Sequence, residues 1–152
     1  MGGGQLAPYG QGMTKIVVGV DGSEGGIRAL RWAAAEARLR GTDLLVVHAW
    51  HYPPVGMEMA PVVALERVEA DARAVLRDVV KEEAGTLGGL LVEERLVHGD
   101  AGTALVAASR DADLVVVGSR GRGGFTGLLL GSVSQHVAHR ATCPVVIVRQ
   151  EA

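Results

Sequence analysis

The segment at residues 118–132, GSRGRGGFTGLLLGS, has the residue types that proteins use to hold phosphate groups. Glycines allow positive φ angles and close approach, so that successive backbone N–H groups converge on an anion. Gly131 and Ser132 come directly before a predicted helix, whose first N–H groups and dipole attract negative charge. Arg120 and Arg122 add positive charge nearby, so this segment predicts a phosphate-binding loop.

Two common phosphate-binding patterns do not fit this loop. A P-loop requires G-x-x-x-x-G-K-[ST], and the chain has no lysine after Lys81. The dinucleotide pattern G-x-G-x-x-G fails at its last position, which is Thr126, and it should follow the first strand of its unit. The spacing present is G-x2-G-x9-G-[ST]. A helix end contributes only about 0.3–1 kcal/mol per charge, so we expect a divalent ion to help neutralise a triphosphate.

The elements that must position the loop alternate between apolar runs and helical patterns. We expect strands at 15–20, 43–50, within 90–100, at 113–119 and at 144–149. Helices are expected to end at Gly41, to cover 65–79, to run from Asp100 through Arg110, and to cover 132–140. This alternation predicts an α/β fold with a single open five-stranded parallel sheet, order 3-2-1-4-5, and helices on both faces. Glu93 and Glu94 favour an edge position for the third strand.

This sheet order predicts the place of a ligand site. Ligands bind beyond the carboxyl ends of parallel strands, where the winding of the sheet reverses. Here that point lies between the first and fourth strands, so VDGS at 20–23 and GSRGRGG at 118–124 are expected to face one crevice. Asp21 would lie in the crevice, although it could also serve only as a cap of the following turn or helix.

Composition excludes several classes of protein. The 152 residues suit one domain, and the net charge of -2 gives no positive field for nucleic acid. Cys143 is the only cysteine, which excludes an intrachain disulfide and fits a reducing compartment. No apolar run could span a membrane, and residues 1–14 lack the pattern of a signal peptide. We therefore expect a disordered leader at 1–14, one domain at 15–152, and a cytoplasmic location.

Other chemically capable side chains do not form a recognisable centre. His136 and His139 lie three residues apart on a predicted helix, but no nearby acid or cysteine completes a metal site. His48 lies inside an apolar strand and is expected to be a satisfied core or crevice histidine. Cys143 is expected to be a small buried hydrophobe rather than a reactive thiol. Because Ser23 has no histidine and aspartate partners that would make it a nucleophile, no catalytic residue is predicted.

The loop spacing resembles the ATP-binding motif of the universal stress protein family. Further blocks in the same order extend the resemblance from Lys15 to Arg149: IVVGVDGS, VVHAW, VHGDA, DLVVVGSRGRGG and GSVSQHVAHRATCPVVIVR. The resemblance implies a Rossmann-type fold of the adenine nucleotide alpha hydrolase-like group. This family has ATP-binding and non-binding branches, and the intact motif resembles the binding branch.

The resemblance also implies a site, with ATP and Mg²⁺ or another divalent ion as cofactors. Gly19 and Asp21 would line the adenosine side, with Asp21 at a ribose hydroxyl, and backbone near Ala49 would meet the adenine edge. The remaining implied binding residues surround ribose and phosphates: Gly118, Ser119, Arg120, Gly121, Arg122, Gly123, Gly124, Gly131, Ser132 and Val133. A homodimer is implied through the last strand, from Pro144 to Arg149.

These observations favour a regulatory ATP-binding protein with slow or no hydrolysis, because no residue stands out as a base that would activate water. An ATPase or phosphotransferase that uses Asp21 or His98 with a metal is one alternative. A dimeric scaffold with a structural nucleotide is another. The sequence does not decide between ATP, ADP and AMP, and it identifies neither a protein partner nor a stress trigger.

Overall fold

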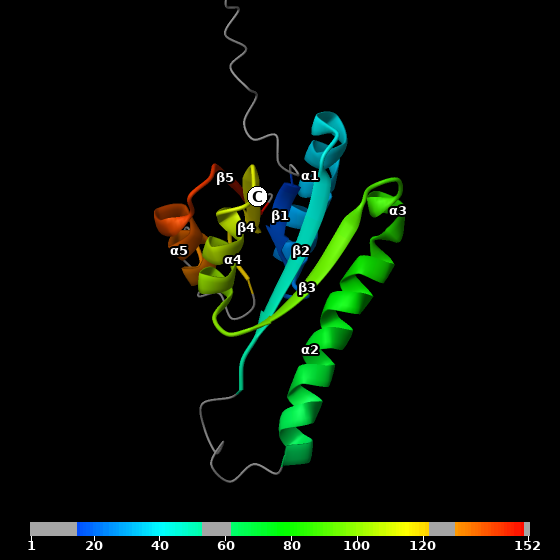
Figure 1. Cartoon of the computed structure of the whole chain (residues 1–152), viewed down its shortest axis with the longest axis vertical. Helices are drawn as coiled ribbons and strands as arrows, with labels where there is room; N and C mark the ends of the chain where they lie inside the picture. Colours follow the sequence, from blue (N-terminus) through cyan, green and yellow to red (C-terminus); the bar gives the residue numbers. More distant parts are fainter. Residues whose placement is uncertain (1–14, 53–61, 122–129, 151–152) are drawn as a thin grey trace, which may run out of the picture.

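Five parallel strands form one open sheet in the order β3-β2-β1-β4-β5 (Figure 1). The structure is a computed structural model that describes residues 15–52, 62–121 and 130–150. The predicted leader at 1–14 lies outside these residues. The strands are β1 Lys15–Gly19, β2 Asp43–Trp50, β3 Val92–His98, β4 Leu114–Gly118 and β5 Val145–Val148. This arrangement confirms the predicted fold class and strand order.

The helices are α1 Glu24–Arg40, α2 Val62–Glu82, α3 Ala84–Leu87, α4 Ala101–Ser109 and α5 Ser132–Arg140. Their ends follow local chemistry. Ser23 caps α1 by accepting from the N–H of Gly26, and Gly41 ends it in the left-handed conformation with φ 63°. Asp100 caps α4 by accepting from the N–H of Thr103. None of the described helices is long and apolar enough to cross a membrane.

The two faces of the sheet carry separate apolar cores. On one face, Ile16, Val18 and Val46 belong to a cluster that includes buried residues of α1, α2 and α3. On the other face, Val17 and Val115 pack with residues of α4 and α5. Figure 1 shows the long α2 beside β3, at the opposite end of the sheet from α5 and β5. The helices therefore cover both faces, as predicted.

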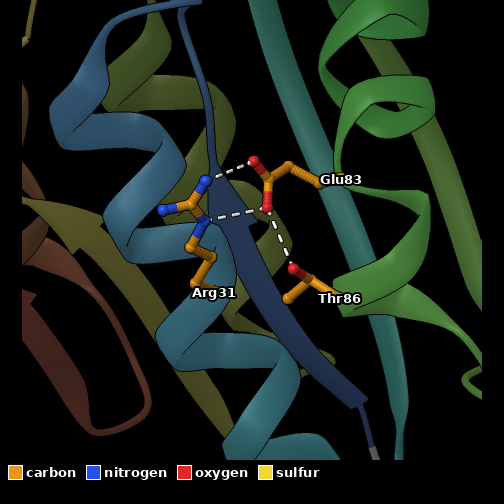
Figure 2. Close-up of polar contacts among 3 residues, drawn as sticks. All are labelled: Arg31, Glu83 and Thr86. Carbon is orange, nitrogen blue, oxygen red and sulfur yellow. Dashed lines mark hydrogen bonds and ion pairs between the residues drawn. The ribbon is translucent and has the colours of Figure 1, made fainter.

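The end of α2 differs from the sequence prediction. The sequence pattern predicts one helix over 65–79, but α2 runs from Val62 to Glu82 and a short further helix, α3, follows Glu83. Glu83 is 7% exposed and accepts hydrogen bonds from Arg31 of α1 and from Thr86 of α3 (Figure 2). The Arg38 guanidinium also donates to the carbonyls of Thr86 and Gly88. These contacts join the α2–α3 junction to α1.

The parallel register brings the carboxyl ends of β1 and β4 together. Ile16, Val17 and Val18 pair with Leu114, Val115 and Val116. The segment after β1 and the segment after β4 therefore leave the same edge of the sheet side by side. This is the point where the winding of the sheet reverses.

Candidate functional site

A pocket with a volume of about 330 Å³ opens beyond the carboxyl ends of β1 and β4. Most of the predicted binding residues line it: Gly19, Asp21, Ala49, Gly118, Arg120, Gly121, Gly131, Ser132 and Val133. Ser119 does not line this pocket and is buried, with 5% exposure. Arg122, Gly123 and Gly124 lie outside the described residues. The structure thus brings segments from four elements of the sequence to one place.

Asp21 lies between the two segments that form the crevice. Its Oδ1 accepts hydrogen bonds from the backbone N–H of Ser23, at 2.9 Å, and from the Ser23 hydroxyl. A Cβ atom placed on Gly121 would lie 2.5 Å from Asp21 Oδ2, so the second carboxylate oxygen faces the loop after β4. The helix cap itself is Ser23, so Asp21 orients the capping serine instead of capping α1 directly.

The ends of the glycine-rich loop are held together at its base. The N–H of Gly131 donates to the carbonyl of Ser119 at 2.6 Å, and the N–H of Ser119 donates to the carbonyl of Val148 in β5 at 2.9 Å. The buried Ser134 hydroxyl lies within hydrogen-bond distance of two carbonyl oxygens, 3.1 Å from Ser119 and 2.9 Å from Gly131. Ser134 lines the pocket as well, and the sequence prediction missed it.

The N-terminus of α5 faces the pocket without a side-chain cap. Its cap residue is Gly131, which has no side chain to accept from the first-turn N–H groups. Ser132 and Val133, the first two residues of α5, both line the pocket. Two of the other helices that begin at this edge of the sheet, α1 and α4, are capped by Ser23 and Asp100. The start of α5 therefore offers free N–H groups and a positive dipole end to an anion.

The glycines of this segment are needed for close approach in the part that the structure describes. Positive φ angles occur at Gly22, Gly41, Gly89 and Gly99, none of which belongs to the loop. A Cβ atom on Gly118 would instead lie 2.8 Å from a backbone oxygen of α1. Two reasons for glycine in this loop follow from the sequence, positive φ angles and close approach. The described residues support close approach.

Two charged residues, Asp21 and Arg120, are among those that line the described part of the pocket. The described residues contain no group of three histidine, cysteine, aspartate or glutamate side chains that could hold a metal ion. A cation bound here would thus take most of its ligands from a bound molecule and from water. The backbone N–H groups of α5 and the Arg120 guanidinium suit a small anionic ligand.

The predicted histidines are placed as follows. His48 Nδ1 lies 2.8 Å from the carbonyl of Val20, so this nitrogen carries the proton and donates, which satisfies the ring as predicted. His98 packs against the Trp50 ring, with centroids 4.6 Å apart, and does not line the pocket. His136 is 40% exposed and its Nδ1 lies 3.8 Å from Asp100 Oδ2, so an acid from α4 does approach it. His139 is exposed on α5.

Cys143 is half-buried and packs against the apolar cluster of α4 and α5. Burial raises the pKa of its thiol, with a further contribution from the charge of Asp113. A higher pKa lowers the fraction of reactive thiolate at neutral pH. The structure therefore agrees with the predicted packing role, although Cys143 is less buried than expected.

A second cavity, with a volume of about 240 Å³, lies between α4 and strands β2 and β3. Its floor is formed by alanines of α4 and by Val47 and Val97. Lys15, Arg95 and Asp111 lie around it, so both signs of charge are present. None of the predicted binding residues lines this cavity.

The reversed winding of the sheet, with a pocket at the point of reversal, places the chain in the class of doubly wound α/β proteins. A sequence model of the universal stress protein family matches residues 13–149. The chain belongs to this family, which confirms the resemblance drawn from its motifs.

Individual relatives support the assignment. A universal stress protein of Mycolicibacterium smegmatis is 38% identical over 138 residues, which cover 88% of this chain and 45% of that protein. The chain thus spans about half the length of the curated relatives it matches. A solved universal stress protein in complex with cAMP is 31% identical, with a TM-score of 0.69 and coverage of 91% and 98% of the two chains. One from Archaeoglobus fulgidus in complex with dAMP is 29% identical, with a TM-score of 0.54 and coverage of 89% and 97%.

Proposed function

We propose that this chain is a cytoplasmic regulatory module that binds an adenine nucleotide, ATP in its active state, in the pocket beyond β1 and β4. The observation that carries the proposal is the uncapped N-terminus of α5, whose first residues line a pocket that Arg120 also lines. The structures of two relatives in complex with cAMP and dAMP support an adenine nucleotide as the ligand class.

The lining residues suggest how the nucleotide would lie. The phosphates would accept hydrogen bonds from the N–H groups at the start of α5, near Ser132 and Val133, and an ion pair from Arg120. The adenosine would lie toward Gly19 and Ala49, with the Asp21 carboxylate near a ribose hydroxyl. Mg²⁺ would be held mainly by phosphate oxygens and water, because Asp21 is the one carboxylate in the described lining.

We expect hydrolysis to be slow or absent. Activation of water needs a base within hydrogen-bond reach of the nucleophile. Asp21 is the candidate within the described lining, and its Oδ1 already accepts from the N–H and the hydroxyl of Ser23. The chemistry of the site thus favours binding and release of a nucleotide over its turnover.

The test is a calorimetric titration of the purified chain with ATP, AMP and adenosine, with and without Mg²⁺. Saturable binding of an adenine nucleotide to one site per chain is expected. Arg120→Gln should weaken the binding of ATP more than the binding of adenosine, because it removes a charge that only the phosphates would contact. Equal losses for ATP and adenosine would contradict the placement of the phosphates beside Arg120.

We also propose that two copies pair through β5. This strand lies at an edge of the sheet, and all four of its residues are partly exposed. Unpaired edge strands offer backbone groups to a second chain, and antiparallel pairing of β5 would join two sheets. Sedimentation should detect a dimer, and Ile147→Pro should shift it to monomer because proline removes a ladder hydrogen bond. A monomer at high concentration would contradict the proposal.

A further inference from the structure

The first turn of α1 contacts the loop after β4 backbone to backbone, at Gly25. A Cβ atom placed on Gly25 would lie 2.5 Å from the carbonyl oxygen of Arg120. From the other side, a Cβ atom placed on Gly118 would lie 2.8 Å from the carbonyl oxygen of Gly25. The two segments that form the crevice thus meet at a distance that a side chain at either position would prevent.

We infer that Gly25 is a positioning residue for the pocket: its missing side chain lets the Arg120–Gly121 backbone lie where a bound nucleotide needs it. This inference rests on the proposed function, since it concerns the same pocket. Gly25 does not line that pocket and lies far from the glycine-rich loop in the sequence. A role for it would therefore act through the loop and not through contact with the ligand.

The loop would have to move to accept a side chain at position 25. The obstacle is a backbone carbonyl, which cannot rotate away as the end of a flexible side chain can. An alanine would require a displacement of about 1 Å to restore ordinary van der Waals contact. Arg120 and Gly121 both line the pocket, so this displacement would change its wall directly.

The helix is the less movable partner. Gly25 and Gly26 are buried, and Ala29 and Leu30 of the next turn are fully buried in the core. Ser23 fixes the start of α1 through its cap and its contacts with Asp21. In the described part of the loop, hydrogen bonds lie at its two ends, where Ser119 bonds with Gly131 and Val148 and the Gln135 side chain donates to the carbonyl of Leu130. Strain from a side chain at position 25 should therefore be relieved mainly by the loop.

If Gly25 served only as a helical residue, helix propensity predicts that Gly25→Ala would raise the stability of the chain. Glycine within a helix is less favourable than alanine by roughly 0.5–1 kcal/mol. An alanine at a helical position with free space should thus be neutral or stabilising. Gly85 of α3 provides this control, because no atom lies within 4 Å of a Cβ placed on it. Gly25→Ala and Gly85→Ala are therefore matched substitutions in helices, and only position 25 lies against the backbone of another segment.

The experiment titrates wild type, Gly25→Ala and Gly85→Ala with ATP and AMP by calorimetry, and records melting temperatures and backbone amide NMR spectra without ligand. We expect Gly25→Ala to weaken binding on the order of tenfold, with shifted amide resonances at residues 119–121. Gly85→Ala should change neither the nucleotide affinity nor the amide resonances of residues 119–121. Gly118→Ala alone and the double variant Gly25→Ala/Gly118→Ala complete a cycle in which the two losses should not add, because both substitutions open the same contact.

The outcomes separate the two claims. A wild-type chain that binds no adenine nucleotide contradicts the proposed function, and the ligand-free spectra then still decide whether Gly25 positions the loop. If wild type and Gly25→Ala bind the nucleotide with equal affinity, and the loop resonances of Gly25→Ala are unshifted, the inference about Gly25 is overturned while the proposed function stands. A Gly25→Ala chain that fails to fold also overturns it, because the contact would then serve the stability of the fold and not the pocket.

Discussion

Arg31 of α1 holds Glu83, at the junction of α2 and α3, through two parallel hydrogen bonds: Arg31 Nε lies 2.9 Å from Glu83 Oε2, and Nη2 lies 2.8 Å from Oε1. The carboxylate is nearly buried, with 8% of its side chain exposed, while the guanidinium is 59% exposed. Thr86 adds a hydrogen bond to Oε2. These two residues are 52 positions apart in the sequence, and their contact ties α1 to the α2–α3 junction.

Glu83→Gln should lower the thermal stability of the chain. An amide oxygen accepts more weakly from a guanidinium than a carboxylate does, and the buried position leaves no water to compensate. We expect the melting temperature to fall by roughly 2–4 °C, measured by circular dichroism. Nucleotide affinity should not change, because neither Arg31 nor Glu83 lines the pocket. A weaker affinity with unchanged melting temperature would show that the pair serves the site instead.

Acid should destabilise the chain through two carboxylates. The hydrogen bond from Arg31 is the main cause that lowers the pKa of Glu83, and the backbone N–H of Thr103 is the main cause that lowers the pKa of Asp100. A carboxylate whose pKa is lowered in the folded state stabilises the fold at a pH above its unfolded-state pKa, which is about 4.3 for Glu and 3.9 for Asp. This stabilisation is lost as the pH falls toward the folded-state pKa. The free energy of unfolding should therefore fall as the pH drops below about 4.5. Urea titrations should show a shallower fall for Glu83→Gln; an equal slope would contradict the assignment.

Two glycines of the pocket should differ in their tolerance of alanine. A Cβ atom on Gly121 would lie 2.5 Å from Asp21 Oδ2, whereas on Gly131 the nearest atoms are 3.4 Å away. The φ angle of Gly131, -73°, also suits alanine. Gly121→Ala should thus displace the Asp21 carboxylate from the pocket wall and weaken nucleotide binding on the order of tenfold, and Gly131→Ala only slightly. Calorimetric titration of the two variants tests this order, and the reverse order would contradict it.

Ser134→Ala should weaken nucleotide binding by opening the base of the loop. The substitution removes a buried hydroxyl that bonds the carbonyls of Ser119 and Gly131, at a cost of about 1 kcal/mol in stability. Ser109 is a control away from the pocket, because its buried hydroxyl bonds the carbonyl of Val106 and also accepts from the backbone N–H of Thr142. Ser109→Ala should lower stability at least as much and leave affinity intact. Equal affinities in both variants would remove Ser134 from the site.

The sequence predicted the sheet well because its signals are local. The apolar run at 43–50 predicted β2 at its observed bounds, and the helix expected at 132–140 is α5. The cap at Asp100 and the helix end at Gly41 were confirmed as well. The resemblance to one family then gave residues that the fold does bring together around one pocket.

The features that the sequence did not predict depend on contacts between distant segments. The sequence around Gly25 reads only as the start of a helix, since the carbonyl it must avoid belongs to Arg120. Ser134 bonds backbone carbonyls, which carry no sequence signal. Glu83 lies beyond the helix predicted at 65–79, and its burial depends on Arg31, which is distant in the sequence. Such relationships require the register of β1 against β4 or the packing of α1 against α3.

The most direct measurement of the central claim is mass spectrometry of nucleotide released when the purified chain is denatured, followed by calorimetric titration of the emptied chain with ATP, AMP and GTP. We predict that an adenine nucleotide is recovered or rebinds at one site per chain, and that Gly121→Ala weakens this binding. A chain that releases no nucleotide and binds none of the three would contradict the account.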